Sequence, residues 1–432
     1  MKKFFFIILS SIFLISNVCA ETFSSALKKA YKNNSELNAE RENIIISEQE
    51  LKISMSSYLP TITLEGSKSQ ESTDKLTNRD GSNATIVDAD TKTRSVSISQ
   101  TIFDFGRGAD LSKSKIGINL AKAKLLKKEQ DILYKTVEAY TGLISANEKL
   151  EINRANVELL NRQVETDRIR LERGQITLSD VSQSESSLAG AEASFIQAQN
   201  DLLTSKLNYE NIIGSLNNAQ SLDKNSIVNY PIPQSLDSAL ELSKKSNPDL
   251  IMSEMEYEQS QKDTSIARSE LVPTAKLSLE KSYSDDLSST IDEREKETLK
   301  ATVTWPFYSG GKNLASLNKN KSLENRSRLT LDSQVKQNQT NVASAWSNYQ
   351  SNKSLLNSVQ LQVKAAEIAN EGITAEYNSG SSGRTTFEVI QSNSLLLNAQ
   401  ISLADSERNY ILSEFNLLKS IGLLNSDYLK LR

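Results

Sequence analysis

The residue types that usually carry out chemistry are scarce in this chain of 432 residues. It contains no histidine, so the commonest general base and the commonest transition-metal ligand are both missing. The one cysteine is Cys19, near the N-terminus, and there is no G-x-S-x-G motif and no paired-carboxylate pattern. The four methionines form no metal relay. These absences predict a protein that is not an enzyme and uses no metal or cofactor, with a surface hydrolase as the weakest alternative.

The first twenty residues have the pattern of a signal peptide. An apolar run at 4–15 follows two lysines, and the small residues Val18 and Ala20 precede the cut that we expect before Glu21. An uncleaved anchor and lipid attachment at the cysteine are the alternatives. After the cut the chain has no run of 18 apolar residues, so any renewed membrane contact has to be made as a β-barrel or at a surface.

Charge is balanced along the chain, with 50 basic and 54 acidic side chains and a formal net charge of −4. A nucleic-acid binder usually carries a basic face, so nucleic acid is not an expected partner. Only six prolines and fifteen glycines interrupt the sequence, which permits long unbroken helices.

Two similar halves make up the sequence after the leader. The segment TFSSALKKAYKNNSEL at 22–37 parallels SLDSALELSKKSNPDL at 235–250, an offset of 213 residues. Three further matches follow in the same order, the last between the final helices at an offset of 208. The pattern predicts a duplicated module rather than a solenoid, whose repeats are much shorter. We expect a signal peptide at 1–20, a first repeat at 21–213, a linker at 214–234, a second repeat at 235–421 and a short tail at 422–432.

Each half begins with a helical stretch and continues with two extended segments whose apolar residues alternate with period two. In the first half Ile62 and Leu64 alternate with polar residues, and in the second half Leu277 and Leu279 do so. The chain is therefore expected to have four strands, paired as two hairpins. The expected bounds are 22–56 and 235–270 for the helical stretches, about 61–103 and 273–305 for the hairpins, and about 67–92 and 282–297 for their polar loops.

A pair of long helices follows each hairpin, predicted at about 108–171 and 178–213 and again at about 311–378 and 386–421. Apolar residues recur at every seventh position along these helices, which is the spacing of a left-handed coiled coil. One such series is Val389, Leu396, Leu403, Tyr410 and Leu417. We interpret these stripes as the packing core of a scaffold and not as a cofactor site.

Two hairpins cannot close a membrane barrel alone, because single-chain barrels have at least about eight strands. Open strand edges in lipid leave unpaired backbone groups that cost several kcal/mol each. An exported chain with these strands therefore has to combine them with copies of itself, most simply by cyclic assembly. Two copies supply eight strands and three supply twelve, and the same assembly sets the helices side by side as a hollow cylinder.

The order of elements and several short motifs resemble the TolC-like outer-membrane factors over nearly the whole mature length. The motifs are QTIFDFGR at 100–107, WPFYSGGK at 305–312 and the helix starts at 33–37 and 247–250. The resemblance implies a mainly α fold with a small β part. In it, a long coiled-coil α-barrel crosses the periplasm and four strands per chain contribute to a 12-stranded trimeric transmembrane β-barrel.

The same resemblance implies a homotrimer in the lipid of the Gram-negative outer membrane, extending into the periplasm. Its partners would be a periplasmic adaptor protein and an inner-membrane pump, either ABC or proton-driven. The implied function is a passive exit duct for type I protein secretion or multidrug efflux, opened at its periplasmic tip when the adaptor and pump dock. The IFDFGR segment favours type I secretion.

The resemblance also implies a lock at the closed inner end. Tyr377 and Arg384 match the family's gate-side tyrosine and arginine, and Asp180 matches their acidic partner. Charge-assisted hydrogen bonds of about 1–3 kcal/mol each suit a lock that must hold and then release. The turn between Tyr377 and Arg384 has two extra residues here, one of them Gly383. The alternative is ordinary helix-end chemistry, with Asp180 near a helix N-terminus and Arg384 solvated.

Glu388 matches the first of two family acids that ring the inner constriction, whereas Gln391 occupies the second position. A ring of three carboxylates favours cations, and we predict a weaker cation preference than two acidic rings would give. Stabilisation of the first helical turn is the alternative role of Glu388. Gly174 and Gly380 resemble the tip glycines that family members present to adaptors, and both also suit turns that need backbone freedom.

Five aromatic residues lie where the strands meet the long helices. Aromatic side chains at such a boundary suit the membrane interface, and packing at the base of the barrel is the alternative. These residues are Phe103, Phe105, Trp305, Phe307 and Tyr308.

A periplasmic coiled-coil adaptor or scaffold without a pore is the alternative to a duct. An adaptor needs one helical hairpin inserted in compact β domains, whereas this chain is expected to have two helical hairpins and four alternating strands. Cell fractionation separates the two possibilities, because a scaffold would be found with the soluble periplasmic proteins.

Overall fold

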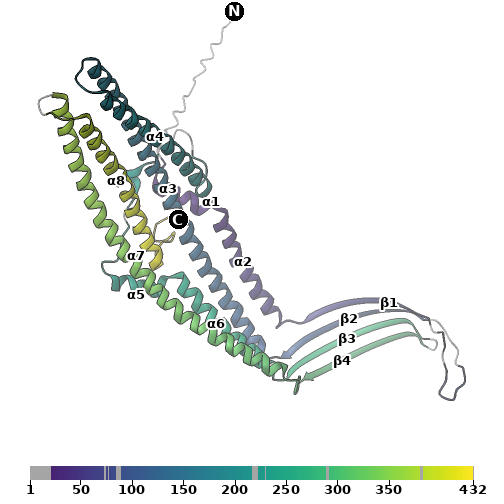
Figure 1. The fold of residues 1–432 in the computed structure, drawn as a ribbon. Coiled ribbons are helices and arrows are strands. Elements are labelled where there is room, and N and C mark those ends of the chain that lie inside the picture. The colour runs from purple at the N-terminus through teal and green to yellow at the C-terminus, as the bar shows by residue number, and fades with distance from the viewer. Residues whose placement is uncertain are drawn as a thin grey trace, which may run out of the picture. The chain divides into compact units, whose positions relative to one another are not determined.

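Long helices dominate the fold, and one four-stranded sheet interrupts them (Figure 1). The computed structural model describes residues 21–72, 74–75, 77–83, 89–216, 222–228, 230–288, 291–379 and 383–431, so the predicted signal peptide lies outside the described residues. The elements are α1 (Phe23–Asn33), α2 (Ser35–Ser56), β1 (Thr61–Glu71), β2 (Ala89–Phe103), α3 (Gly106–Glu172), α4 (Leu178–Ile212), the 3₁₀ turn η1 (Lys224–Ser226), α5 (Leu236–Ser246), α6 (Pro248–Ser269), β3 (Thr274–Ser288), β4 (Ile291–Thr304), α7 (Lys312–Ser379) and α8 (Thr386–Ile421).

The helical stretch at the start of each half is two helices, where the sequence predicted one. Asn34 ends α1 in an extended conformation, and its Oδ1 accepts hydrogen bonds from the backbone N–H groups of Glu36 and Leu37 at 3.0 and 3.1 Å. Asn34 therefore caps the start of α2. In the second half, Asn247 is extended because Pro248 follows it and disfavours helical geometry in the preceding residue.

Two compact units make up the chain, and each contains segments from both sequence repeats. The first unit comprises Met1–Asn38, Lys128–Asn247 and Gln339–Arg432, and the second comprises Ala39–Lys127 and Pro248–Asn338. The compact units therefore follow a different division of the chain from the duplication seen in the sequence.

The sheet lies in the second unit and has the order β1-β2-β3-β4, antiparallel throughout. The polar loops predicted at 67–92 and 282–297 are shorter than expected, because the strands continue into both of them. Cross-strand ion pairs accompany the polar part of the sheet. Lys68 lies 2.9 Å from Asp90, and Lys281 lies 2.6 Å from Glu295. The ends of these strands carry polar side chains on both faces, so the alternation of apolar residues could not predict them.

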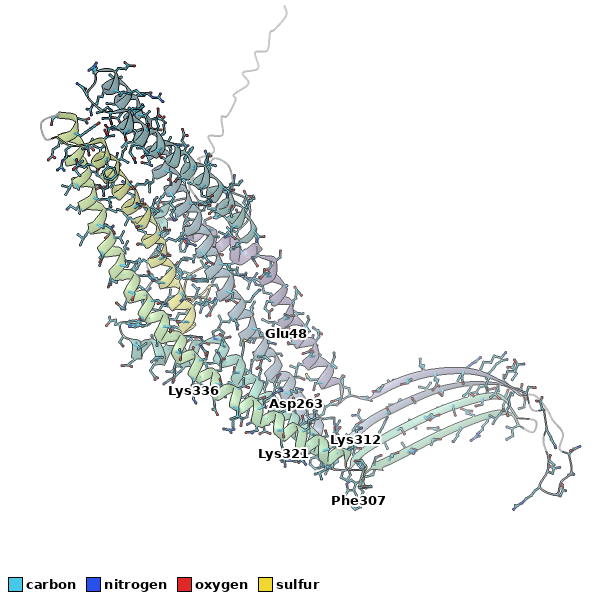
Figure 2. The ribbon with its side chains drawn as sticks, viewed as in Figure 1. Glu48, Asp263, Phe307, Lys312, Lys321 and Lys336 are labelled. Carbon is cyan, nitrogen blue, oxygen red and sulfur yellow. The ribbon has the colours of Figure 1, made fainter. Side chains whose placement is uncertain are left out.

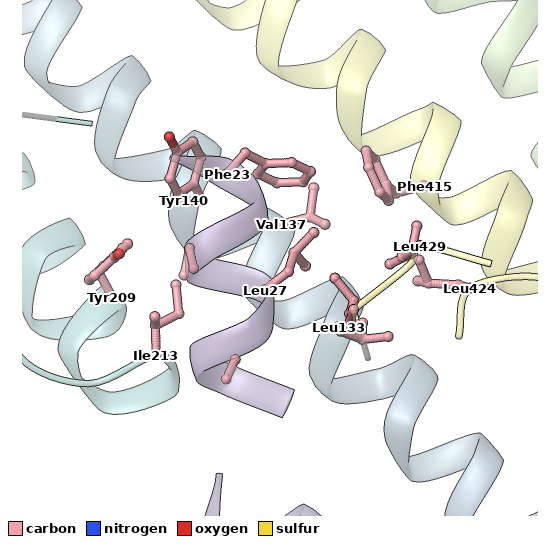
Figure 3. Close-up of a cluster of buried hydrophobic side chains, with 14 of the residues drawn as sticks. Phe23, Leu27, Leu133, Val137, Tyr140, Tyr209, Ile213, Phe415, Leu424 and Leu429 are labelled. Atoms are coloured by element: carbon pink, nitrogen blue, oxygen red, sulfur yellow. The ribbon is translucent and has the colours of Figure 1, made fainter. Parts of the chain in front are cut away.

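The largest buried cluster lies in the first unit, around α1 (Figure 3). The ring of Phe23 packs edge-on against Tyr140 of α3 and Phe415 of α8, with centroids 5.2 and 5.5 Å away. Leu424 and Leu429 of the C-terminal tail join the same cluster. Helix α1 and the tail therefore bring the first-repeat helix α3 and the second-repeat helix α8 into one core.

The predicted linker contributes polar contacts to this core. The hydroxyl of Tyr140 donates to the backbone oxygens of Glu21 and Asp223 at 2.9 and 3.0 Å. Lys224, in η1, forms ion pairs with Glu148 of α3 at 2.6 Å and with Glu407 of α8 at 2.5 Å. The linker is thus fastened to helices from both repeats.

The seven-residue apolar stripes lie on packed faces of the long helices. Val342 and Leu417 are fully buried, and Val389 is almost so. Among the described helices, none combines the length and apolar character that a membrane span requires.

Candidate functional site

The turns that join the long helices end in matching capping boxes. The backbone N–H of Thr177 donates to Oδ2 of Asp180 at 2.9 Å, and the backbone N–H of Asp180 donates to Oγ1 of Thr177 at 3.3 Å. Thr385 and Glu388, 208 positions further on, repeat both bonds at 2.9 and 3.2 Å. Each carboxylate therefore satisfies a backbone donor that would otherwise be unpaired at a helix start.

These bonds keep both acids ionised. Hydrogen bonds from the backbone N–H and then the side chain of Thr177 hold the pKa of Asp180 below its usual value. The backbone N–H of Thr385, followed by the guanidinium of Arg384, lowers the pKa of Glu388. Both carboxylates therefore stay ionised to a lower pH than an ordinary aspartate or glutamate does.

Glycine provides left-handed backbone in both turns. Gly174 has a φ of +69° between α3 and α4, and Gly383 has a φ of +67° shortly before α8. The second of these belongs to the two-residue extension noted in the sequence. Gly380 lies outside the described residues.

Arg384 is held by ion pairs within the second helix pair. Its Nε donates to Oε2 of Glu376 at 2.7 Å, and its Nη1 donates to Oε1 of Glu388 at 2.9 Å. The first of these bonds, with support from the second, raises the pKa of the guanidinium above its ordinary value. Arg384 therefore ties the end of α7 to the start of α8.

Tyr377 links the second helix pair to the first. Its hydroxyl donates to Oδ1 of Asp167 on α3 at 3.1 Å and lies 2.8 Å from Oγ1 of Thr386. The guanidinium of Arg170 lies over the tyrosine ring, 4.2 Å from its centroid. Both Tyr377 and Asp167 are buried, so this contact is shielded from water.

Asp167 is fully buried and accepts several hydrogen bonds. Besides Tyr377, it accepts hydrogen bonds from Ser184 Oγ on α4 at 2.5 Å and from Gln163 Nε2 at 2.9 Å. Three of the four long helices thus meet at one carboxylate. We call Asp167, Ser184, Tyr377 and Thr386 the helix-end network.

The structure does not bring Asp180 to Tyr377 or Arg384 within one chain, and the acid beside Tyr377 is Asp167. The sequence carries a signal for this residue that our prediction did not use. Asp167 follows Val164 by three positions, so it stands on the packed face of the seven-residue pattern, where a carboxylate is unusual. Ser184 has the same spacing from Val181.

The two predicted constriction residues differ in exposure. Glu388 is partly covered by its bonds to Thr385 and Arg384, whereas Gln391 is exposed on α8. Among the described residues, no group of three or more histidine, cysteine or acidic side chains is arranged to hold a metal ion.

The five predicted interface aromatics lie between the strands and the long helices of the second unit. Phe103 and Phe105 pack edge to face with centroids 4.5 Å apart, as do Trp305 and Phe307 at 5.4 Å. The indole N–H of Trp305 donates to the backbone oxygen of Leu271 at 3.2 Å. Phe307 and Tyr308 are more than four-fifths exposed, and Figure 2 shows Phe307 beyond the end of β4. Exposed rings of this size indicate a surface that meets something other than water.

Two pairs of long coiled-coil helices joined to a small antiparallel sheet define the class of outer-membrane channel proteins. The chain belongs to the outer membrane efflux protein family, which matches residues 26–215 and 239–423. Proteins of this family are channels rather than enzymes. The chain is accordingly an outer-membrane protein with a periplasmic extension, and its general role is that of an efflux or secretion channel.

Individual relatives cover most of the chain. It is 26% identical to the outer membrane efflux protein BepC of Brucella suis, over 96% of this chain and 88% of that protein. It is 23% identical to the proteases secretion protein PrtF of Dickeya chrysanthemi, over 93% and 88%, respectively. It is 22% identical to the outer membrane protein TolC of Escherichia coli, over 94% and 83%.

Solved structures share the fold. The CmeC outer membrane channel of Campylobacter jejuni superposes with a TM-score of 0.82 at 16% identity, covering 93% of this chain and 85% of that one. The outer membrane protein VceC of Vibrio cholerae gives a TM-score of 0.76 at 18% identity, covering 93% and 96%.

Proposed function

We propose that three copies of this chain combine their sheets into a twelve-stranded barrel in the outer membrane. The supporting observation is a four-stranded sheet with β1 and β4 as its edges and an apolar face turned to the surroundings. On that face Leu64, Leu299 and Val303 are 77%, 70% and 73% exposed. Open edges in lipid are costly and four strands cannot close, so the edges of neighbouring copies pair in the barrel.

The long helices of the three copies form the wall of a passive duct through the periplasm. Export energy comes from an inner-membrane pump, ABC or proton-driven, and a periplasmic adaptor protein joins the two. The duct carries the cargo of type I protein secretion or of multidrug efflux, and relatives named for protease secretion and for efflux support both classes.

The lock at the inner end consists of Tyr377 and Arg384 with the acids that receive their hydrogen bonds. Tyr377 binds Asp167 across the two helix pairs, and Arg384 binds Glu376 and Glu388. Asp180 caps the start of α4 near this lock. Glu388 forms the charged ring of the constriction, with Gln391 as its uncharged neighbour.

The adaptor docks at the turns that carry Gly174 and Gly380. Support comes from two large apolar side chains at the starts of α4 and α8. Leu178 and Phe387 are 69% and 57% exposed. Exposed apolar residues next to a turn suit a protein contact that pulls the helix ends apart.

One preparation tests the assembly and the pore together. Protein purified in detergent should have the mass of a trimer by mass photometry, and it should form conducting pores in planar bilayers. A stable monomer recovered with the soluble periplasmic proteins would refute the duct and favour the coiled-coil scaffold.

A further inference from the structure

A groove opens on the apolar face of the sheet where its side chains change from aliphatic to charged. Strand register places Gly66, Arg94, Tyr283 and Glu295 in one row across β1 to β4. Directly paired residues of a sheet share a face, so all four belong to the face that carries the exposed aliphatic residues. Two rows precede them toward the helices. The nearer row has Leu64 and Val96 on β1 and β2 but Lys281 and Glu297 on β3 and β4, and the next row is aliphatic throughout, with Ile62, Ile98, Leu279 and Leu299.

Gly66 creates the groove by lacking a side chain. A Cβ added at this position would meet no atom within 4 Å, so the space above the glycine is empty. The groove has a volume of about 470 Å³. Its lining includes the side chains of Leu64, Arg94, Val96, Lys281 and Tyr283. It is therefore aliphatic on the side toward the helices and polar on the other side.

Arg94 supplies an unused cation to this groove. It forms no hydrogen bond or ion pair with any residue in the described part of the chain. A guanidinium presents paired N–H donors that match the oxygens of a phosphate. Lys281 stands beside it, held by Glu295 at 2.6 Å. The acids of this face include Asp285 and Glu293 on β3 and β4, and Asp90 near the start of β2, where Lys68 pairs with it at 2.9 Å. An anion is therefore favoured beside Arg94, over β1 and β2.

In the membrane, the groove would lie close to the depth of lipid phosphates. This step rests on the proposed function, because only a sheet in the membrane turns this face to lipid. From Trp305 to Glu295, which stands in the row of Arg94, the chain covers about 33 Å along the strand, or about 25 Å of membrane depth at a tilt of about 40°. Barrels usually have an apolar band about 25 Å tall. The row of Arg94 therefore stands at the far edge of such a band, at the headgroup layer.

We propose that the groove binds an anionic membrane lipid through its headgroup phosphate. The phosphate contacts Arg94 and Lys281, and the acyl chains lie along Leu64, Val96 and the aliphatic row of Ile62. Leu64, Val96 and the aliphatic row of Ile62 distinguish a lipid from free phosphate, which would gain nothing from them.

Two variants separate charge from shape. Arg94→Gln removes the unused cation. Gly66→Val fills the groove without changing charge, and valine suits a strand. Lys276→Gln is the matched control, because Lys276 pairs with Thr302 on the opposite face. Binding of short-chain phosphatidylglycerol to the full-length protein in detergent is measured by native mass spectrometry, beside short-chain phosphatidylcholine and inorganic phosphate.

Both test variants should bind phosphatidylglycerol about tenfold more weakly than the unmodified protein. The control should bind it unchanged, phosphatidylcholine should bind more weakly, and inorganic phosphate should not compete. Equal phosphatidylglycerol affinity in the unmodified protein and both test variants would overturn the proposal, as would equally strong competition by inorganic phosphate.

The same preparations are tested for pores in planar bilayers. Pores with unaltered lipid affinity in both variants refute the lipid site and leave the duct standing. Absence of pores in the unmodified protein refutes the duct, while selective loss of phosphatidylglycerol binding in the variants would still support the groove.

Discussion

The hydroxyl of Tyr377 donates a hydrogen bond to the carboxylate of Asp167, 3.1 Å away and 210 positions earlier in the sequence. The bond joins α7 of the second repeat to α3 of the first. Because Asp167 is fully buried, the loss of one donor leaves its carboxylate with fewer hydrogen bonds in a place where water does not reach to replace them. The contact is therefore suited to hold two helix pairs together at their ends.

Replacing Tyr377 with phenylalanine tests this contact directly. Tyr377→Phe keeps the ring under Arg170 and removes the hydroxyl that donates to Asp167 and lies 2.8 Å from Oγ1 of Thr386. We expect a higher single-channel conductance and an unfolding free energy lower by about 1–3 kcal/mol, the usual range for a hydrogen bond to a charged group. Tyr308→Phe, at an exposed position, is the control and should change neither quantity. Lower stability with unaltered conductance would show a contact that supports the fold without gating it.

Substitution of Asp180 or of Thr177 should have the same effect on stability, because the two residues form one helix cap. If the carboxylate acts as the helix cap seen here, Asp180→Ala and Thr177→Ala should each lower the free energy of unfolding by about 1 kcal/mol, with equal conductance. Since the pKa of Asp180 is lowered in the folded state, its contribution is present above the unfolded pKa and is lost as pH falls through the folded value. Thermal unfolding between pH 7 and pH 3 measures both effects. A rise in conductance in the aspartate variant alone would give Asp180 a partner in another copy.

Loss of the Arg384 ion pairs should loosen the tip. Arg384→Gln removes both bonds between the end of α7 and the start of α8, and we expect a higher single-channel conductance. High salt should raise the conductance of the unmodified protein by more than it raises the conductivity of the solution, because these pairs are exposed and screened by ions. The control is Arg168→Gln, which breaks an exposed pair with Glu185 at 2.6 Å between α3 and α4. An equal rise in the control would show a general loss of charge, and no rise in either would remove Arg384 from the gate.

Glu388 should set a modest cation preference. Glu388→Gln is expected to lower the cation-to-anion permeability ratio obtained from reversal potentials, and Glu185→Gln should leave it unchanged. The ratio in the unmodified protein should persist as pH drops through the ordinary glutamate value of about 4.5 and decline only below it, because the folded pKa is lowered. The nearby Arg384 offsets part of the charge, which keeps the preference weak. A neutral result in the Glu388 variant would leave helix capping as its role.

The core around α1 should depend on the hydroxyl of Tyr140. Tyr140→Phe keeps the ring against Phe23 and removes one donor to the backbone oxygens of Glu21 and Asp223, which still accept from Asp223 N–H and from Ser226, respectively. We expect an unfolding free energy lower by about 0.5–1.5 kcal/mol, the usual net value of a neutral hydrogen bond, and an unaltered conductance, since the cluster holds the core and not the tip. Chemical denaturation of the trimer measures the change. Full stability in this variant would mean that water replaces the lost donor.

The broad fold could be predicted from the sequence because its signals are local. Period-two alternation around Ile62 and Leu277 indicated strands, and seven-residue spacing from Val389 to Leu417 indicated long coiled-coil helices. The mainly α fold with four strands is confirmed. Helix breaks at Asn34 and Asn247 were missed, since a single capping residue leaves little trace in a periodic pattern.

The sequence by itself determined the duplication, the four strands, the long coiled-coil helices and the turns that carry Gly174 and Gly383, because periodicity and glycine content act over a few neighbouring residues. Only the tertiary structure decided that Asp167 rather than Asp180 lies beside Tyr377. It also decided that Gly66 and Arg94 share a row with Tyr283. Such pairs depend on the rotation of one helix against another and on strand register, which short stretches of sequence do not specify.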